Sequence, residues 1–311
     1  MAAGKKQIHL VKGQADGRSA TTAGERTAPP TVPGRWILAA LGLVVAAAAV
    51  CAWGSLCLLF WQGWWQLLYH PTSKVTQTPA SVGLNFDAVG FAATDTGEPR
   101  LRGWWIPAGT GAAFGQYTVV YLHGTKGNLG DCLQALAALH REGVNVLAFD
   151  YRGYGESQFV HPSEKHWRED AGWALQYLEG TRQIGAGSLV VDGEGLGANL
   201  ALEVAAAHPD LAGVVVNDAE ARPMEVVLGD PRAGLVPARL LVGDRYDLTG
   251  PAKRLRIPSL WFEEAGSGAA TAPEAYSEVS ATKMLVWLPE TGVREKEYAE
   301  ALSRWLGDLG R

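Results

Sequence analysis

One stretch constrains the fold of this chain more than any other: residues 36–69 contain no charged side chain. A helix needs about 20 consecutive apolar residues to cross the hydrocarbon core of a bilayer, and residues 36–60 meet that length alone. Aromatic residues flank the stretch, as they do at membrane interfaces: Trp36 at one end and Trp61, Trp64, Trp65 and Tyr69 at the other. The sequence therefore predicts a transmembrane helix within residues 36–69.

This stretch has two other interpretations. A buried core helix seldom runs so long without a charge. A cleaved signal peptide would need a small-residue cleavage site, which Ala46–Ala49 could supply. Because the apolar run continues well past those alanines, we favour a retained anchor over a cleaved peptide.

The charges on either side of the anchor predict its orientation. Residues 1–35 carry six basic and two acidic side chains, whereas the nearest basic residue downstream is Lys74, which stands alone. The positive-inside rule places residues 1–35 in the cytoplasm and everything after about residue 70 outside. The first 35 residues are rich in Gly, Ala, Thr and Pro, which is typical of a disordered tail.

Composition excludes several classes of protein. Hydrophobic residues make up 47% of the 311 residues, too many for a disordered chain. The net charge of −5 argues against a nucleic-acid partner, which selects a basic surface. Two of the three cysteines, Cys51 and Cys57, lie in the anchor, and no Cys/His spacing fits a metal site. We therefore expect no metal, and nothing in the composition calls for a cofactor.

Residues 70–311 predict one α/β domain, because short apolar runs alternate with longer amphipathic patterns. Strands separated by helices imply a mostly parallel sheet covered by helices on both faces. Residues 219–256 interrupt the alternation and predict a small insertion over the carboxyl edge of the sheet. Strands are expected at 84–92, 101–107, 117–124, 144–150, 188–193, 212–218, 259–263 and 283–288, and helices near 129–141, 163–180, 196–208 and 294–308.

Local motifs of residues 68–310 occur in a recognisable order. They are LLYHPTSK (67–74), GWWIPA (103–108), YLHGTKGN (121–128), FDYRGYGES (149–157), GEGLGAN (193–199) and RIPSLWF (256–262). In this order the chain resembles the α/β-hydrolase superfamily, and within it the membrane-anchored, serine-aminopeptidase-like branch. The resemblance implies an α/β-hydrolase fold, with a catalytic serine, acid and histidine at the carboxyl edge of the sheet.

The resemblance also locates the catalytic positions, and this chain departs from them. The strand-to-helix turn that carries Gly-x-Ser-x-Gly reads Gly193-Glu-Gly195-Leu-Gly197 here, so a glycine stands at the nucleophile position. In an ungapped register the acid position is Gly266 and the histidine position is Val293. Loops tolerate shifts, so Glu263 or Glu264 could replace the acid. No shift restores the histidine, because the last histidine of the chain is His208.

Other parts of the site are expected to persist. By resemblance the backbone N–H groups of Thr125 and Leu196 form the oxyanion hole, which needs no side chain. Candidate pocket residues around it are His123, Glu194, Glu263 and Glu264. For His123 we favour a structural role in shaping its loop over a role as a base. Asp150, Arg152, Tyr154 and Ser157 are expected to form an internally bonded turn.

A competing chemical interpretation remains for the strand-to-helix turn at residues 193–197, the elbow. Gly193-x-Gly195-x-x-Ala198 after a strand also fits the dinucleotide fingerprint, with Asp218 placed to bind a ribose. That fingerprint usually opens its domain, whereas here several strands precede it. We give this interpretation less weight than the hydrolase resemblance.

These observations predict a membrane-anchored α/β-hydrolase-fold protein that has lost its triad. It would bind a small molecule or a protein partner without hydrolysing it. The alternative is an active serine-type hydrolase, esterase-like or peptidase-like, that uses a displaced nucleophile such as Ser157 or only its oxyanion hole.

Overall fold

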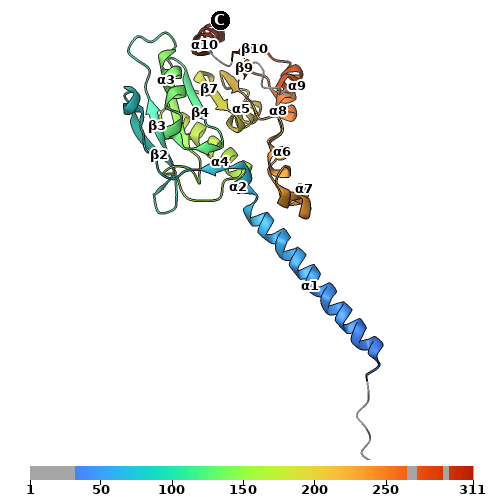
Figure 1. Ribbon diagram of the computed structural model, residues 1–311. Helices are drawn as coiled ribbons and strands as arrows, with labels where there is room; N and C mark the ends of the chain where they lie inside the picture. The colour runs from blue at the N-terminus through green and yellow to red at the C-terminus, as the bar shows by residue number, and fades with distance from the viewer. Residues whose placement is uncertain (1–31, 265–271, 290–293, 311) are drawn as a thin grey trace, which may run out of the picture. The chain divides into compact units, whose positions relative to one another are not determined.

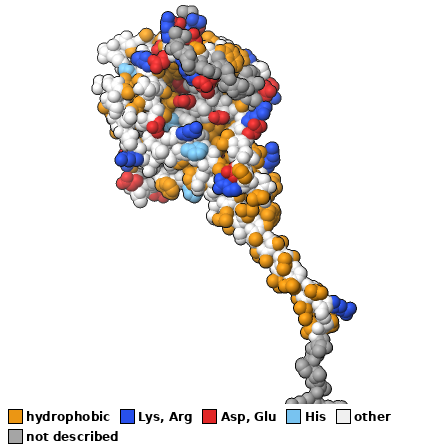
Figure 2. Space-filling view, in the orientation of Figure 1, with side chains coloured by type: hydrophobic (Ala, Val, Ile, Leu, Met, Phe, Trp, Pro, Cys, Tyr) orange, Lys and Arg blue, Asp and Glu red, His pale blue; other side chains and the backbone are white. Residues whose placement is uncertain are grey.

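The computed structural model describes residues 32–264, 272–289 and 294–310, and the chain divides into two units, residues 1–51 and 52–311. Helix α1 (Gly34–Gly63) is the apolar helix expected from the sequence. It is long and apolar enough to cross a membrane, with a mean hydropathy of 2.4, and it is the one such helix among the described residues. Hydrophobic side chains cover its surface (Figure 2). The predicted tail, residues 1–35, lies almost wholly outside the described residues.

The end of the apolar stretch differs from the prediction. Helix α1 ends at Gly63 and a short helix, α2 (Trp65–Leu68), follows it. The rings of Trp64 and Tyr69 are buried in the hydrophobic core of the globular unit, so their assignment to a membrane interface was wrong. The Tyr69 hydroxyl donates to Asp244 and lies 2.8 Å from the Tyr246 hydroxyl. An uncharged apolar sequence suits a protein core as well as lipid, so the sequence does not distinguish burial in the domain from a membrane interface.

The globular unit is built on an eight-stranded sheet with the order β10-β9-β8-β7-β4-β6-β3-β2. Neighbouring strands are parallel from β10 to β6, whereas β3 pairs antiparallel with both β6 and β2. The strands are β2 (Asp87–Ala93), β3 (Pro99–Ile106), β4 (Thr118–Leu122), β6 (Asn145–Asp150), β7 (Leu189–Glu194), β8 (Gly213–Asn217), β9 (Ser259–Glu264) and β10 (Lys283–Leu288). Each matches a run predicted from the sequence.

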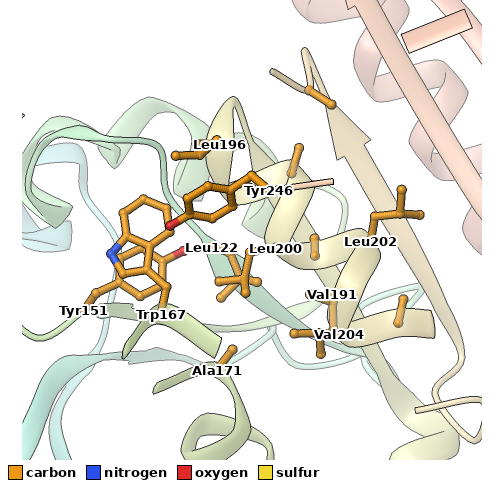
Figure 3. Close-up of a cluster of buried hydrophobic side chains, with 14 of the residues drawn as sticks. Leu122, Tyr151, Trp167, Ala171, Val191, Leu196, Leu200, Leu202, Val204 and Tyr246 are labelled. Carbon is orange, nitrogen blue, oxygen red and sulfur yellow. The ribbon is translucent and has the colours of Figure 1, made fainter. Parts of the chain in front are cut away.

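Helices cover both faces of this sheet, as predicted (Figure 1). Successive residues of a strand point to opposite faces, and the core accordingly forms two clusters. One contains side chains of α3 (Leu133–Arg141) and α10 (Arg294–Leu309). The other contains α4 (Glu164–Gln176), followed by a π-helical turn over 177–181, and α5 (Leu196–Ala207). Figure 3 shows part of the second cluster, where Leu196 and Leu200 of α5 lie beside Tyr246, and Trp167 beside Tyr151.

Besides α2 and short 3₁₀ turns, three small elements were not predicted. Strands β1 (His70–Pro71) and β5 (Lys126–Gly127) pair as a separate two-stranded ribbon, which ties the chain just after α2 to the loop after β4. Helix α9 (Ala272–Glu278) lies between β9 and β10. All three are too short to give a periodic sequence pattern.

The insertion predicted at 219–256 consists of α6 (Pro223–Leu228), α7 (Ala238–Leu241), α8 (Thr249–Arg254) and a 3₁₀ turn over Pro231–Leu235. Two points of the insertion, Glu220 and Tyr246, are tied to helix α5 by the buried side chain of Asn199. The Asn199 amide donates to the carbonyls of Glu220 and Tyr246, at 2.7 and 2.8 Å, and its oxygen accepts from the Glu220 N–H at 2.9 Å.

Candidate functional site

The turn between β7 and α5 has the backbone of a nucleophile elbow. Gly195 adopts φ +56° and ψ −122° immediately before the first residue of α5. A Cβ on Gly193 would overlap the carbonyl of Gly197, and a Cβ on Gly197 would overlap the carbonyls of Leu122 and His123. Both flanking glycines are therefore required for close packing of helix α5 on strands β7 and β4.

Space at the nucleophile position itself is open. A Cβ on Gly195 would meet no atom within 4 Å, so sterically a side chain fits there. The positive φ would still cost a non-glycine residue about 1–3 kcal/mol. The turn has kept the geometry that exposes a nucleophile, while the residue present has no atom that could attack a carbonyl.

The loop after β4 lies against this elbow. The carbonyls of Leu122 and His123 contact Gly197, and a Cβ on Gly124 would lie 3.4 Å from the Glu194 carbonyl. The Thr125 carbonyl is fixed by the Tyr154 hydroxyl at 2.9 Å and by the His70 N–H at 2.9 Å. The residues predicted to form the oxyanion hole thus come from adjoining segments, and the orientation of their N–H groups toward a ligand stays a prediction.

His123 does not belong to an open pocket. Its side chain is 1% exposed and packs against Tyr151, Tyr154 and Trp167, with ring centroids 4.5–6.2 Å apart. Nδ1 lies 2.8 Å from the Gly124 carbonyl, and burial lowers the pKa of the imidazole to about 4. His123 is therefore a neutral histidine that shapes its loop, as favoured above, and its inclusion among the pocket residues was wrong.

The turn after β6 is internally bonded, as predicted. The Ser157 hydroxyl donates to the Asp150 carbonyl at 2.6 Å and accepts from the Arg102 N–H at 2.9 Å. Arg152 pairs with the fully buried Asp170 through Nε at 2.5 Å. Because residue Ser157 is 9% exposed and its hydroxyl is already bonded twice, it is held as a structural group.

A charged cluster stands at the carboxyl edge of β8 and β9, and the sequence did not reveal it. Arg294, at the start of α10, pairs with Asp218 at 3.1 Å and with Glu264. The Glu264 N–H donates to the other oxygen of Asp218 at 2.9 Å. Both carboxylate oxygens of Asp218 are thus engaged within the domain, so in the dinucleotide interpretation a ribose hydroxyl would have to share an oxygen with Arg294 or with the Glu264 N–H.

A cavity of about 300 Å³ opens beside the elbow between α3 and α10. Glu194 lines it, as expected from its place next to Gly195, and accepts from the Tyr121 hydroxyl at 2.6 Å. Polar lining residues from other elements are Asn217, Asp218, Arg294, Tyr298, Gln134, Arg141 and Glu295. The cavity therefore places charged groups of both signs next to the elbow.

Glu263 and Glu264 point to opposite faces of β9. Glu264 joins the charged cluster, whereas Glu263 is 3% exposed, and its Oε1 has no hydrogen-bond partner among the described residues. Burial, with the nearby charge of Asp218, raises the pKa of Glu263 to about 8. Its assignment to the open pocket was wrong, since the side chain is enclosed. Gly266 and Val293, the predicted acid and histidine positions, lie outside the described residues.

Similarity to known proteins confirms the family that the sequence motifs indicate. The family model described as "Serine aminopeptidase, S33" matches residues 116–226, which include the elbow. The uncharacterized protein Rv2307c of Mycobacterium tuberculosis is 30% identical over 263 residues, covering 82% of this chain and 88% of that protein. This chain belongs to the serine-aminopeptidase-like α/β-hydrolase family.

Other relatives match over shorter segments. The uncharacterized protein YfhR of Salmonella typhimurium is 34% identical over 137 residues, 42% of this chain, so the match spans less than half (43%) of that relative. The uncharacterized membrane protein YNL320W of Saccharomyces cerevisiae is 29% identical over 140 residues, 45% of this chain and 47% of the relative. Among solved structures, the Pyrococcus furiosus esterase Pf2001 has a similar fold (TM-score 0.59, 20% identity), covering 77% of this chain and 98% of that one.

Within the part of the chain that the structure describes, no group of three His, Cys, Asp or Glu side chains is arranged to hold a metal ion. Backbone N–H groups and charged side chains such as those around the elbow can orient a ligand, but they cannot form a covalent acyl intermediate.

Proposed function

We propose that this chain is a membrane-anchored member of the α/β-hydrolase family that binds a carbonyl or carboxylate compound at its elbow without hydrolysing it. The observation that carries the proposal is Gly195, which keeps the elbow conformation of a nucleophile and lacks the nucleophile. The second support is that the chain has no histidine after His208, so the histidine base that this family places after its last strand is missing.

The ligand class follows from the groups that remain. Backbone N–H donors at the start of a helix favour a carbonyl oxygen or an anion. The neighbouring cavity offers Glu194, Arg294 and Tyr298 for the rest of the ligand. Its volume of about 300 Å³ lies at the lower end of the range for small-molecule sites.

The proposal also includes the anchor and its orientation. Helix α1 is long and apolar enough to span a bilayer, and a yeast relative is named as a membrane protein. The basic residues that precede α1 favour a cytoplasmic N-terminus and an extracytoplasmic domain. Protease added to intact spheroplasts should therefore digest a tag at the C-terminus. Full protection of the tag, with digestion only after lysis, would reverse the orientation.

The hydrolase question has a direct test in the full chain purified in detergent. We expect no stoichiometric labelling by a fluorophosphonate probe and no rapid turnover of short acyl p-nitrophenyl esters, because Gly195 has no hydroxyl. We expect the same for Gly195→Ser, since an added serine would find no histidine to accept its proton. Labelling of the wild type would support the alternative of an active hydrolase, and Ser157→Ala would then show whether Ser157 is its nucleophile.

The proposed binding of a carboxylate at the elbow is tested separately. Hexanoate, as a probe carboxylate, should raise the melting temperature of the full chain in a saturable way. Gly195→Val, which fills the open position, should abolish that rise. The absence of any saturable rise in the wild type would contradict binding at the elbow.

A further inference from the structure

We propose that the insertion, residues 219–256, is seated in the surface of the bilayer that α1 crosses, through the exposed apolar side chains of Leu235 and Leu240. The inference rests on the proposed membrane anchor and goes beyond it, because it gives the globular domain a lipid contact of its own.

The first observation is a bond between the anchor helix and the insertion. The Trp53 indole N–H donates to the Leu235 carbonyl at 3.1 Å. Trp53 lies ten residues before the end of α1 at Gly63, about 15 Å along a helix. The Pro231–Leu235 turn therefore lies beside the apolar helix itself, well before the point where the chain enters the folded domain.

The second observation is the depth that this bond implies. A span of about 20 residues counted from Trp36, next to the basic Arg35, ends near residue 55. Trp53 would then stand at the outer boundary of the hydrocarbon core, a position that tryptophan favours. Leu235, which is bonded to it, would lie at the same boundary.

The third observation is what the insertion exposes there. Leu240 is 85% exposed and Leu235 is 61% exposed, although the removal of large apolar side chains from water is favourable. Val226 of α6 is also exposed, at 53%. Arg232 pairs with Asp230 and Arg222 with Glu225, whereas Arg239 and Arg245 form no ion pair among the described residues. The proposal assigns the seating to the apolar side chains, and vesicles without anionic lipid test that basis.

The test uses the full chain in phosphatidylcholine vesicles, with its three cysteines replaced by alanine. A single cysteine carrying an environment-sensitive fluorophore is placed by Leu240→Cys, Val44→Cys or Lys296→Cys in turn. Val44 lies inside α1, and Lys296 is an exposed residue of α10, at the other end of the globular unit from α7 (Figure 1). Spin-labelled lipids then report the depth of each fluorophore.

We expect the fluorophore at position 240 to be quenched more by spin labels near the headgroup than by labels near the chain end. This pattern corresponds to a depth of about 5–10 Å below the headgroups. The fluorophore at position 44 should show the reverse preference, and that at 296 no quenching. Leu235→Asp should reduce quenching at 240.

The outcomes separate the two proposals. If position 44 is quenched and position 240 is not, the anchor stands and the seating of the insertion is wrong. If position 44 is not quenched, the anchor itself fails. Quenching at 240 that requires anionic lipid would overturn its apolar basis.

Discussion

Gly197→Ala is expected to destabilise the globular unit by at least about 3 kcal/mol, because its Cβ would overlap the carbonyl oxygens of Leu122 and His123. These are backbone atoms of the central strand β4 and its loop, so no side-chain rearrangement can relieve the overlap. For a domain of this size the melting temperature should fall by roughly 6–12 °C. Thermal unfolding of the full chain in detergent, followed by circular dichroism, measures the change.

Two other glycines serve as matched controls. Gly172 lies in the interior of α4 with no atom within 4 Å of an added Cβ, so Gly172→Ala should stabilise by about 0.5–1 kcal/mol. The added Cβ of Gly195→Ala meets no atom within 4 Å either, but the positive φ of this position disfavours any residue other than glycine. Its melting temperature should therefore lie between those of the other two variants. If Gly197→Ala melted within a degree or two of the wild type, the close approach of α5 to β4 would be contradicted.

The second large effect concerns pH and Glu263. Burial raises the pKa of this carboxyl to about 8 in the folded state, against 4.5 when it is exposed in the unfolded chain. The folded protein therefore holds a proton that the unfolded chain releases between these two values. Stability from this group is fully present below about pH 4.5 and is lost as the pH rises to about 8. The loss approaches about 1.4 kcal/mol per pH unit within that window.

Melting temperatures measured at pH 5 and pH 8 test this predicted loss of stability from Glu263. In the wild type the melting temperature should fall with rising pH. Glu263→Gln should have a smaller slope because glutamine does not ionise, and the slope that remains comes from other buried carboxyls whose pKa values are raised, such as Asp150 and Asp170. The slope is the decisive quantity, since a buried amide can add a constant cost at both pH values. Glu300→Gln, on the exposed side of α10, serves as the control. Equal slopes in the wild type and Glu263→Gln would show that Glu263 is not the group responsible.

The sequence predicted the sheet and its helices because periodic burial leaves a local pattern. All eight strands of the main sheet begin within three residues of their predicted starts. The elbow could be predicted equally well, because only glycine fits at positions 193 and 197 and the two glycines are visible in the sequence. In contrast, the apolar sequence around Trp64 and Tyr69 carries no sign of whether lipid or protein will cover it.

The parts of the site that depend on long-range contacts were harder to predict. Arg294 gave no local signal, although it meets Asp218 and Glu264, two acids that follow neighbouring strands. Collecting the charged residues just beyond the strands of one sheet edge would have suggested this cluster. The enclosure of Glu263 and His123 depends on which face of a strand each side chain takes and on what covers that face. The sequence next to Glu263 and His123 indicates neither the face that each side chain takes nor what covers that face.

The bonds of Asn199 limit how the insertion can move. Two of its points, Glu220 near the start and Tyr246 ten residues before the end, are fastened to the same buried side chain, one turn after Gly195. The segment between them therefore cannot swing away as a rigid flap hinged at one end, because either point would have to abandon a buried amide. The cavity beside the elbow opens elsewhere, between α3 and α10, and no residue of the insertion lines it. A ligand can therefore enter this cavity while a lipid contact holds α6 and α7 in place.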